Sequence, residues 1–193
     1  MEKYYENEKF SQLQLSGAEY SDMKFVDCEF NGCSFEELKL SNVSFSGCGF
    51  SHCHAASLLF KNSSFNDTQL YKCTVYGISW GELMAAGAFS EPLSSVQDSR
   101  LRGNIFEGMS MRKFDFGGNS LLQCLFAESD IRDADFRSCD LDNTEFLRCD
   151  LRGADFRGAK GYVPDIFSCK MKGAMFSSPE VLSLLNGLEI KID

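Results

Sequence analysis

Large apolar residues recur every five positions along most of the chain. In the first run, taken in steps of five from Phe10 to Trp80, only Ala55 is small. In the second run, from Leu101 to Phe176, only Gly161 breaks the series. A period of five matches neither an α-helix, at about 3.6 residues per turn, nor a continuous strand, whose side chains alternate with a period of two. The chain therefore carries an internal repeat that is neither helical nor a simple alternation.

A second series explains the period. The residues two positions before each large one are mostly small or apolar, and in an extended segment residues two apart share a face. Each group of five is thus predicted to be a very short strand with two inward side chains, followed by a corner. All nine cysteines occupy the small inward position, where Cys behaves as a compact hydrophobe, and we expect free buried thiols. They are Cys28, Cys33, Cys48, Cys53, Cys73, Cys124, Cys139, Cys149 and Cys169.

The second run also repeats in residue type every 20 positions, as in Phe116, Phe136 and Phe156. This interval holds four groups of five, so each coil should have four walls and a square cross-section. Successive coils would stack at the inter-strand spacing of roughly 4.8 Å, and about eight of them would form a rod. Parallel ladders along such a rod need no crossover helices, because the coil itself returns the chain to each wall.

These residues carry a family resemblance. The stretches AESDIRDADFRSCDLDNTEF (127–146) and LRCDLRGADFRGA (147–159) resemble tandem pentapeptide repeats, written A(D/N)LXX. The resemblance implies an all-β fold, a right-handed quadrilateral parallel β-helix. Within the family the chain resembles the topoisomerase-protecting group, the Qnr-type and albicidin-resistance proteins, and residues 162–193 are most similar to the albicidin-resistance type. For that group the resemblance implies a bacterial homodimer that binds DNA gyrase or topoisomerase IV and confers antibiotic resistance.

The two runs are out of phase by one residue, which divides the chain into segments. Residues 1–80 form a first β-helix block and residues 94–177 a second. Residues 81–93 interrupt the repeat as a projecting loop, a kink or a bulge, and such a segment suits partner contacts better than a regular wall. The alternative interpretation is a tolerated insertion without a role. Residues 178–193 form a C-terminal capping or dimerisation segment.

The last segment changes its period. Ser178 is a candidate N-cap before Pro179, the body of a short helix spans 181–185, and Asn186 and Gly187 are stop signals. Residues 188–193 then alternate like a strand. The segment holds more large aliphatic residues than a simple cap needs, and a self-complementary apolar end favours a two-fold dimer. The candidate dimerisation residues are Val181, Leu182, Leu185, Leu188, Ile190 and Ile192.

Composition limits the chemistry. The net charge of -9 argues against direct binding to nucleic acid or to an anionic membrane surface. The N-terminus shows no secretory signal, and an odd number of cysteines favours the reducing cytoplasm. His52 and His54 flank the inward Cys53 and should point outward, so we expect no metal site. With no cleft, cofactor motif or catalytic set, we expect no cofactor, no small-molecule substrate and no enzyme activity.

Charge patterning supplies the candidate partner site. In the second block the residue before the large one is acidic six times in succession, and two further acids, Glu82 and Glu91, lie in the interruption. Such regular carboxylates would imitate a DNA backbone and attract a basic groove. Alternatively, the acids are part of the repeat and hydrogen-bond at its corners, and Arg132, Arg137, Arg152 and Arg157 follow four of them closely. The six are Asp130, Asp135, Asp140, Glu145, Asp150 and Asp155.

The predicted function is binding of a bacterial type II topoisomerase and its protection from a poison or toxin, through DNA mimicry in one version. The alternative is a structural or scaffolding protein with a different protein partner.

Overall fold

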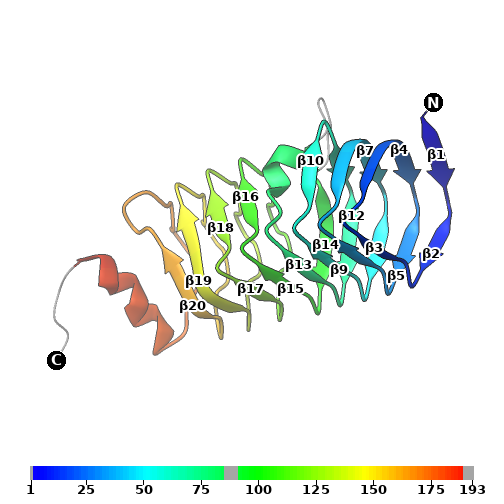
Figure 1. The fold of residues 1–193 in the computed structure, drawn as a ribbon. Coiled ribbons are helices and arrows are strands. Elements are labelled where there is room, and N and C mark those ends of the chain that lie inside the picture. Colours follow the sequence, from blue (N-terminus) through cyan, green and yellow to red (C-terminus); the bar gives the residue numbers. More distant parts are fainter. Residues whose placement is uncertain (1, 85–90, 189–193) are drawn as a thin grey trace.

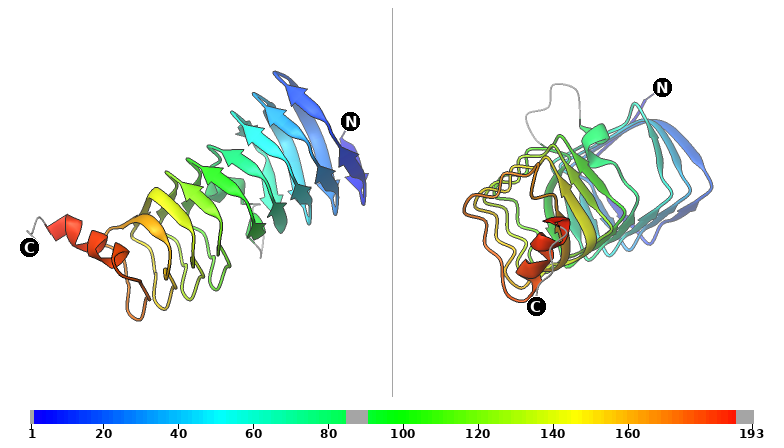
Figure 2. Two further views of the ribbon diagram at one scale, coloured as in Figure 1. Left: turned by 90° about the horizontal axis from the view of Figure 1, so that it is seen from below. Right: turned by 90° about the vertical axis from the view of Figure 1, so that its left-hand side faces the viewer.

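The computed structural model describes residues 2–84 and 91–188. The chain winds as a coil of short strands stacked along one axis, from β1 at one end to a helix at the other (Figure 1). All pairs between the named strands are parallel. The predicted right-handed quadrilateral parallel β-helix is confirmed, and its four-sided coils are visible along the axis in Figure 2.

The strands form three hydrogen-bonded sheets that wrap the coil. The first sheet contains β1 (Lys3–Glu6), β4 (Glu19–Val26), β7 (Lys39–Ser46), β10 (Leu59–Lys61) and β11 (Ser64–Asn66). The second contains β2 (Lys9–Ser11), β5 (Glu29–Asn31), β8 (Gly49–Ser51), β12 (Thr68–Tyr71) and β14 (Leu93–Gln97). The third contains β3 (Gln14–Ser16), β6 (Ser34–Glu36), β9 (His54–Ala56), β13 (Thr74–Tyr76), β15 (Arg100–Arg102), β16 (Ile105–Glu107), β17 (Ser120–Leu122), β18 (Leu125–Ala127), β19 (Asp140–Leu147) and β20 (Lys160–Pro164).

Each regular strand pairs with the equivalent strand one coil later, in the register that the recurring residue types predicted. Phe10 pairs with Phe30 across β2 and β5, and Phe126 pairs with Phe146 across β18 and β19. Equivalent rings therefore stack on one another, with centroids 4.9 Å and 5.0 Å apart in these two pairs. Offset stacking of this kind fills the interior along the axis.

The small inward position has a role beyond packing. Its polar side chains donate to the backbone carbonyl one coil earlier, for example Cys53 Sγ to Phe30 O at 3.4 Å, Ser129 Oγ to Phe106 O at 3.1 Å and Asn119 Nδ2 to Val96 O at 2.9 Å. Cys, Ser, Thr and Asn are small side chains that can donate such a bond. Ala134 and Ala154 occupy the same position and fill it by packing alone. All nine cysteines are free thiols, and all except the half-buried Cys169 are buried.

The interruption is an insertion into one coil. Val75 pairs with Ala55 on one side and with Leu101 on the other, and the second partner is six positions further along the chain than a regular coil would place it. Phe65 still bridges Met84, so the extra residues enter between Met84 and Leu93, where a register shift also marks a bulge. A short 3-10 helix, η1 (Trp80–Leu83), precedes them and buries Trp80 and Leu83. Residues 85–90 of the interruption lie outside the described residues.

A second irregularity falls where Gly161 breaks the repeat. Asp140 pairs with Lys160 in the regular register, but Thr144 pairs with Tyr162, two positions short of it. Gly161 has a φ of +74° and a Cβ there would lie 2.6 Å from the Cα of Asp142, so only glycine fits. The coil is shortened accordingly, and Tyr162 turns inward in place of the missing large side chain, against Phe156 and Phe176.

The C-terminal segment begins as predicted and ends differently. A helix follows Pro179, but it is a 3-10 helix, η2 (Glu180–Leu188), and it continues through Asn186 and Gly187, which were expected to stop it. Leu188, expected to start a strand, lies in the helix, and the rest of the expected strand, 189–193, falls outside the described residues. Leu184 packs against the core, so η2 covers the end of the stack. Among the described residues no helix has the length and apolar character needed to cross a membrane.

The two blocks, residues 2–80 and 94–177, are packed differently. The buried phenylalanines of the first block keep between 3% and 9% exposure, whereas those of the second are 0% exposed. In the second block, the corners within 111–119, 131–139 and 151–159 are closed by a hydrogen bond from a backbone N–H to the carbonyl three residues earlier, as from Ala134 to Ile131 and from Cys139 to Phe136. In the described part of the first block no corner has such a bond. The second block is thus the tighter coil.

Candidate functional site

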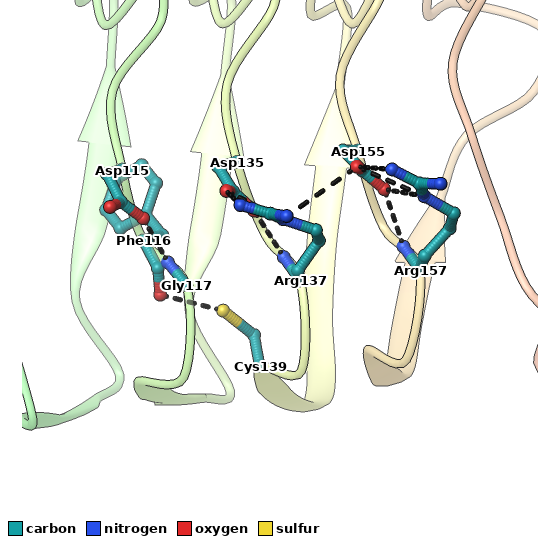
Figure 3. A network of polar contacts seen from close by, with 8 residues as sticks. All are labelled: Asp115, Phe116, Gly117, Asp135, Arg137, Cys139, Asp155 and Arg157. Carbon is teal, nitrogen blue, oxygen red and sulfur yellow. Dashed lines mark hydrogen bonds and ion pairs between the residues drawn. The ribbon is translucent and has the colours of Figure 1, made fainter.

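Four of the six predicted acids form ion pairs with the arginine two residues later. Arg137 donates from its side chain and from its backbone N–H to Asp135, the latter at 2.8 Å, and Arg157 repeats this arrangement on Asp155 (Figure 3). The guanidinium also reaches the next coil, since Arg137 Nε lies 3.9 Å from Asp155 Oδ2. We call this set the Asp–Arg ladder: Asp130, Asp135, Asp150, Asp155, Arg132, Arg137, Arg152 and Arg157.

The ladder carboxylates are largely buried by their partners. Hydrogen bonds from the arginine side chains hold the pKa of Asp135 and Asp155 below the usual range, and the same cause lowers the pKa of Asp130 and Asp150. Each acid also accepts the backbone N–H two residues on, and Asp115 does the same for Gly117 at 2.8 Å. These aspartates are corner elements of the fold with their charge neutralised in place.

The other two predicted acids are exposed. Asp140 and Glu145 both lie on β19, and neither forms an ion pair within the described residues. Asp142, which the sequence analysis did not single out, projects from the same strand and is contacted by the side chain of Asn143 at 3.0 Å. We call Asp140, Asp142 and Glu145 the β19 acidic patch. In this patch, unlike the ladder, negative charge faces solvent without an arginine partner.

The two acids of the interruption behave differently from each other. Glu82 is exposed on η1. Glu91 is half-buried, and its Oε1 accepts the backbone N–H of Ser110 at 2.9 Å. Glu91 therefore ties the insertion to the neighbouring coil.

The C-terminal end exposes apolar side chains around a groove. Leu182 and Leu188 on η2 are exposed, as are Val163 and, at 75%, Phe167 in the turn after β20. A groove of about 390 Å³ lies beside them, and its lining includes Val163, Phe167, Leu184 of η2, and Asp142 and Glu145 of β19. Of the other predicted dimerisation residues, Val181 and Leu185 are half-buried on η2, and Ile190 and Ile192 lie outside the described residues.

Comparison with known proteins agrees with this geometry. The family model for pentapeptide repeats matches eight copies over residues 9–47 and 120–160. The chain thus carries pentapeptide repeats over these two stretches.

Solved structures of pentapeptide-repeat proteins resemble it in fold. A trypsin-treated variant of QnrB1, described as a plasmid-mediated fluoroquinolone resistance protein, is 14% identical over all of both chains, with a TM-score of 0.51. HetL from the cyanobacterium Nostoc, described as involved in heterocyst differentiation regulation, is 12% identical over 90% of this chain and 87% of its own, with a TM-score of 0.48. At such identity the likeness concerns the fold. No curated protein sequence matches the chain.

The two histidines lie at the surface, His52 exposed and His54 half-buried. His52 packs edge-on against Tyr71, and His54 lies 3.9 Å from Glu36. Across residues 2–84 and 91–188, no three His, Cys, Asp or Glu side chains are placed to hold a metal ion.

For the four ladder acids, the structure agrees with the alternative that the sequence analysis gave, in which the acids hydrogen-bond at corners of the repeat. The sequence analysis did not single out Asp142 or Phe167. Phe167 follows Ile166, which keeps the large position of the repeat, so the period of five would have placed Phe167 on the outside.

Proposed function

We propose that the protein binds a bacterial type II topoisomerase in the cytoplasm and protects it from a poison. The observation that carries the proposal is the β19 acidic patch on a narrow filled rod. Unpaired carboxylates on such a rod suit a basic surface that otherwise receives DNA, and complementary potentials speed and orient the encounter. The similarity in fold to QnrB1, which is described as a plasmid-mediated fluoroquinolone resistance protein, supports the same proposed function.

The proposal moves the contact surface away from the Asp–Arg ladder. A carboxylate that already accepts two arginine hydrogen bonds has little left to offer a basic partner. Asp140 and Glu145 keep their charge free, with Asp142 between them. DNA mimicry would therefore use the β19 acidic patch rather than regular ladders along every wall.

We further propose that the protein acts as a homodimer joined at its C-terminal end. Leu182, Leu188 and Phe167 present apolar surface there, and a two-fold contact would cover the same patch on both copies. Light scattering at tens of micromolar should give the dimer mass, and Leu182→Asp with Phe167→Asp should give a folded monomer. A wild-type monomer under these conditions would contradict the assembly and leave the topoisomerase proposal standing.

The decisive experiment is a DNA cleavage assay with purified gyrase and a fluoroquinolone. The protein should reduce poison-stabilised cleavage, and the effect should weaken as salt is raised. Asp140→Lys with Glu145→Lys should reduce protection at least tenfold. The matched control is Glu8→Lys with Glu37→Lys, which changes the net charge equally at exposed positions of the first block. Equal loss from both pairs would mean that overall charge, not the patch, governs binding.

A scaffold with another protein partner remains the second candidate. It is favoured by the apolar C-terminal end, which suits any protein contact. Absence of binding to gyrase and to topoisomerase IV at low salt would make it the better account.

A further inference from the structure

The interior of the first block contains a gap at Ala55. One inward column runs through Leu15, Phe35, Ala55, Val75 and Leu101, each paired with the next across adjacent strands. Strand pairing holds the backbone of Ala55 at the same distance from the axis as its neighbours. A methyl group at this position cannot reach the space that Phe35 fills one coil earlier.

The neighbouring columns do not close the gap. Phe50 is stacked on Phe30 with ring centroids 4.7 Å apart, and Phe45 is stacked on Phe65 at the same distance. These rings are held by their own columns and cannot turn toward Ala55 without losing that stacking. The result is a cavity of about 50 Å³ in the middle of the first block. Its walls include Phe35, Phe50, Ala55, Val75 and Trp80.

The cavity offers nothing to water. The polar atoms of its lining point elsewhere: Cys53 Sγ donates to Phe30 O, Cys73 Sγ donates to Phe50 O at 3.3 Å, and Trp80 Nε1 donates to Asn104 Oδ1 at 3.1 Å. None of the described buried polar atoms without a partner belongs to a lining residue. A buried water needs two to four polar partners, so this space stays dry.

We propose that the cavity is a binding site for small apolar molecules of about the size of a xenon atom. A dry apolar cavity of about 150 Å³ takes up benzene or xenon, and one a third as large selects the smaller guest. The guest would gain dispersion contacts with Phe35, Phe50 and Val75. Ala55 and Leu58, which also line the site, are only partly buried.

The site is independent of the topoisomerase proposal. It lies in the first block, on the inner side of β9, whereas the β19 acidic patch lies on the outer surface of the second block. Failure of one proposal therefore leaves the other untouched.

The test is a ¹²⁹Xe NMR titration of the full chain. We expect a saturable change in the xenon chemical shift with wild-type protein, above the linear change from surface contacts. Ala55→Val should abolish the saturable part, because its two added methyl groups fill the cavity. Ala56→Val adds the same groups on the outer face of the same strand and should leave the xenon response unchanged.

Thermal unfolding supplies a second readout. Filling the cavity should raise the midpoint for Ala55→Val by about 2–4 °C, whereas Ala56→Val should leave it close to the wild-type value. Val75→Ala enlarges the cavity and should increase the saturable xenon response. A linear response in the wild type overturns the proposal, and so does a saturable response that persists in a folded Ala55→Val protein.

Discussion

The first and second blocks share the five-residue repeat, but they differ in how completely large side chains fill its inward positions. In the second block the inward columns are unbroken up to Gly161, and its core phenylalanines are fully shielded. In the first block Ala55 opens a cavity, and Phe45 and Phe50 keep 8% and 9% exposure. The fold tolerates a missing side chain because each coil contacts only its neighbours, so a local defect stays local.

The corners differ as well. In the second block, the corners within 111–119, 131–139 and 151–159 carry backbone turn hydrogen bonds, and the Asp–Arg ladder braces two of its walls from outside. In the described part of the first block no corner carries such a backbone bond. We infer that the second block is the rigid part of the molecule and the first block the compliant part. The predictions that follow test this contrast.

The largest effect is expected from removing a stacked ring. Phe136 lies between Phe116 and Phe156 at 4.9 Å and 4.8 Å, and Phe45 lies between Phe25 and Phe65 at 5.0 Å and 4.7 Å. Phe136→Ala should lower the free energy of unfolding by about 4 kcal/mol. Phe45→Ala should cost about 1 kcal/mol less, because the looser coil around it can collapse further into the space. Urea unfolding measures both, and equal losses would contradict the packing contrast.

The next largest effect is expected in how the stability of the second block changes as the pH falls. The folded pKa values of the ladder aspartates lie below the unfolded value of about 3.9, so the unfolded chain takes up protons first as the pH falls. The ladder's contribution to the free energy of unfolding is therefore fully present above the unfolded pKa, and it is lost as the pH falls through the folded pKa. Hydrogen exchange between pH 6 and pH 3 should show β17 and β18 losing protection more steeply than β5 and β8.

A matched substitution checks the cause. Changing Asp135 and Asp155 to Asn should flatten the acid response of the second block. Glu19→Gln removes an ion pair with Lys39 whose side chains are well exposed, and it should change little. If Glu19→Gln alters the profile as much as the ladder variant, the ladder does not brace the second block.

The cysteine thiols are expected to differ in how fast a maleimide labels them. Burial raises the pKa of Cys48 and Cys124 to about 11 and that of Cys139 to about 12, so these thiols should resist a maleimide until the chain unfolds. Cys169 is only half-buried, and its hydrogen bond with Cys149 lowers its pKa to about 7. Mass spectrometry after brief labelling should find Cys169 modified first. Labelling of Cys139 at a similar rate in native buffer would contradict its burial.

Much of the fold could be predicted from the sequence, but several features of its interior and surface could not. The period of five and the return after four such groups predicted the walls, the register and the inward cysteines, because each follows from which side chains can share a narrow interior. The hydrogen bonds that these cysteines donate were not predicted, since packing alone accounted for their size. The direction of the Asp130 and Asp135 carboxylates was left open between partner binding and corner bonding, because the identity of a residue does not say whether a neighbour has already paired it. At Gly161 the large residue of the repeat is missing, and the period alone did not predict that Tyr162 would fill its place.

The smallest predicted effect comes from one methyl group at a corner in each block. Gly17 has a φ of +61° and Gly118 a φ of +72°, and a Cβ at either position would meet nothing within 4 Å. Alanine there costs about 1 kcal/mol, because an L side chain in the left-handed region crowds its own carbonyl. At Gly118 the corner is fixed by the bond from Asn119 N–H to Phe116 O, so that cost should appear in full in urea unfolding. At Gly17 no bond closes the corner, and the backbone can relax to reduce the strain. An equal loss of stability at Gly17 and Gly118 would mean that the corners of the two blocks are equally rigid. The corner bonds would then not explain the difference between the blocks, and ring packing would be its basis.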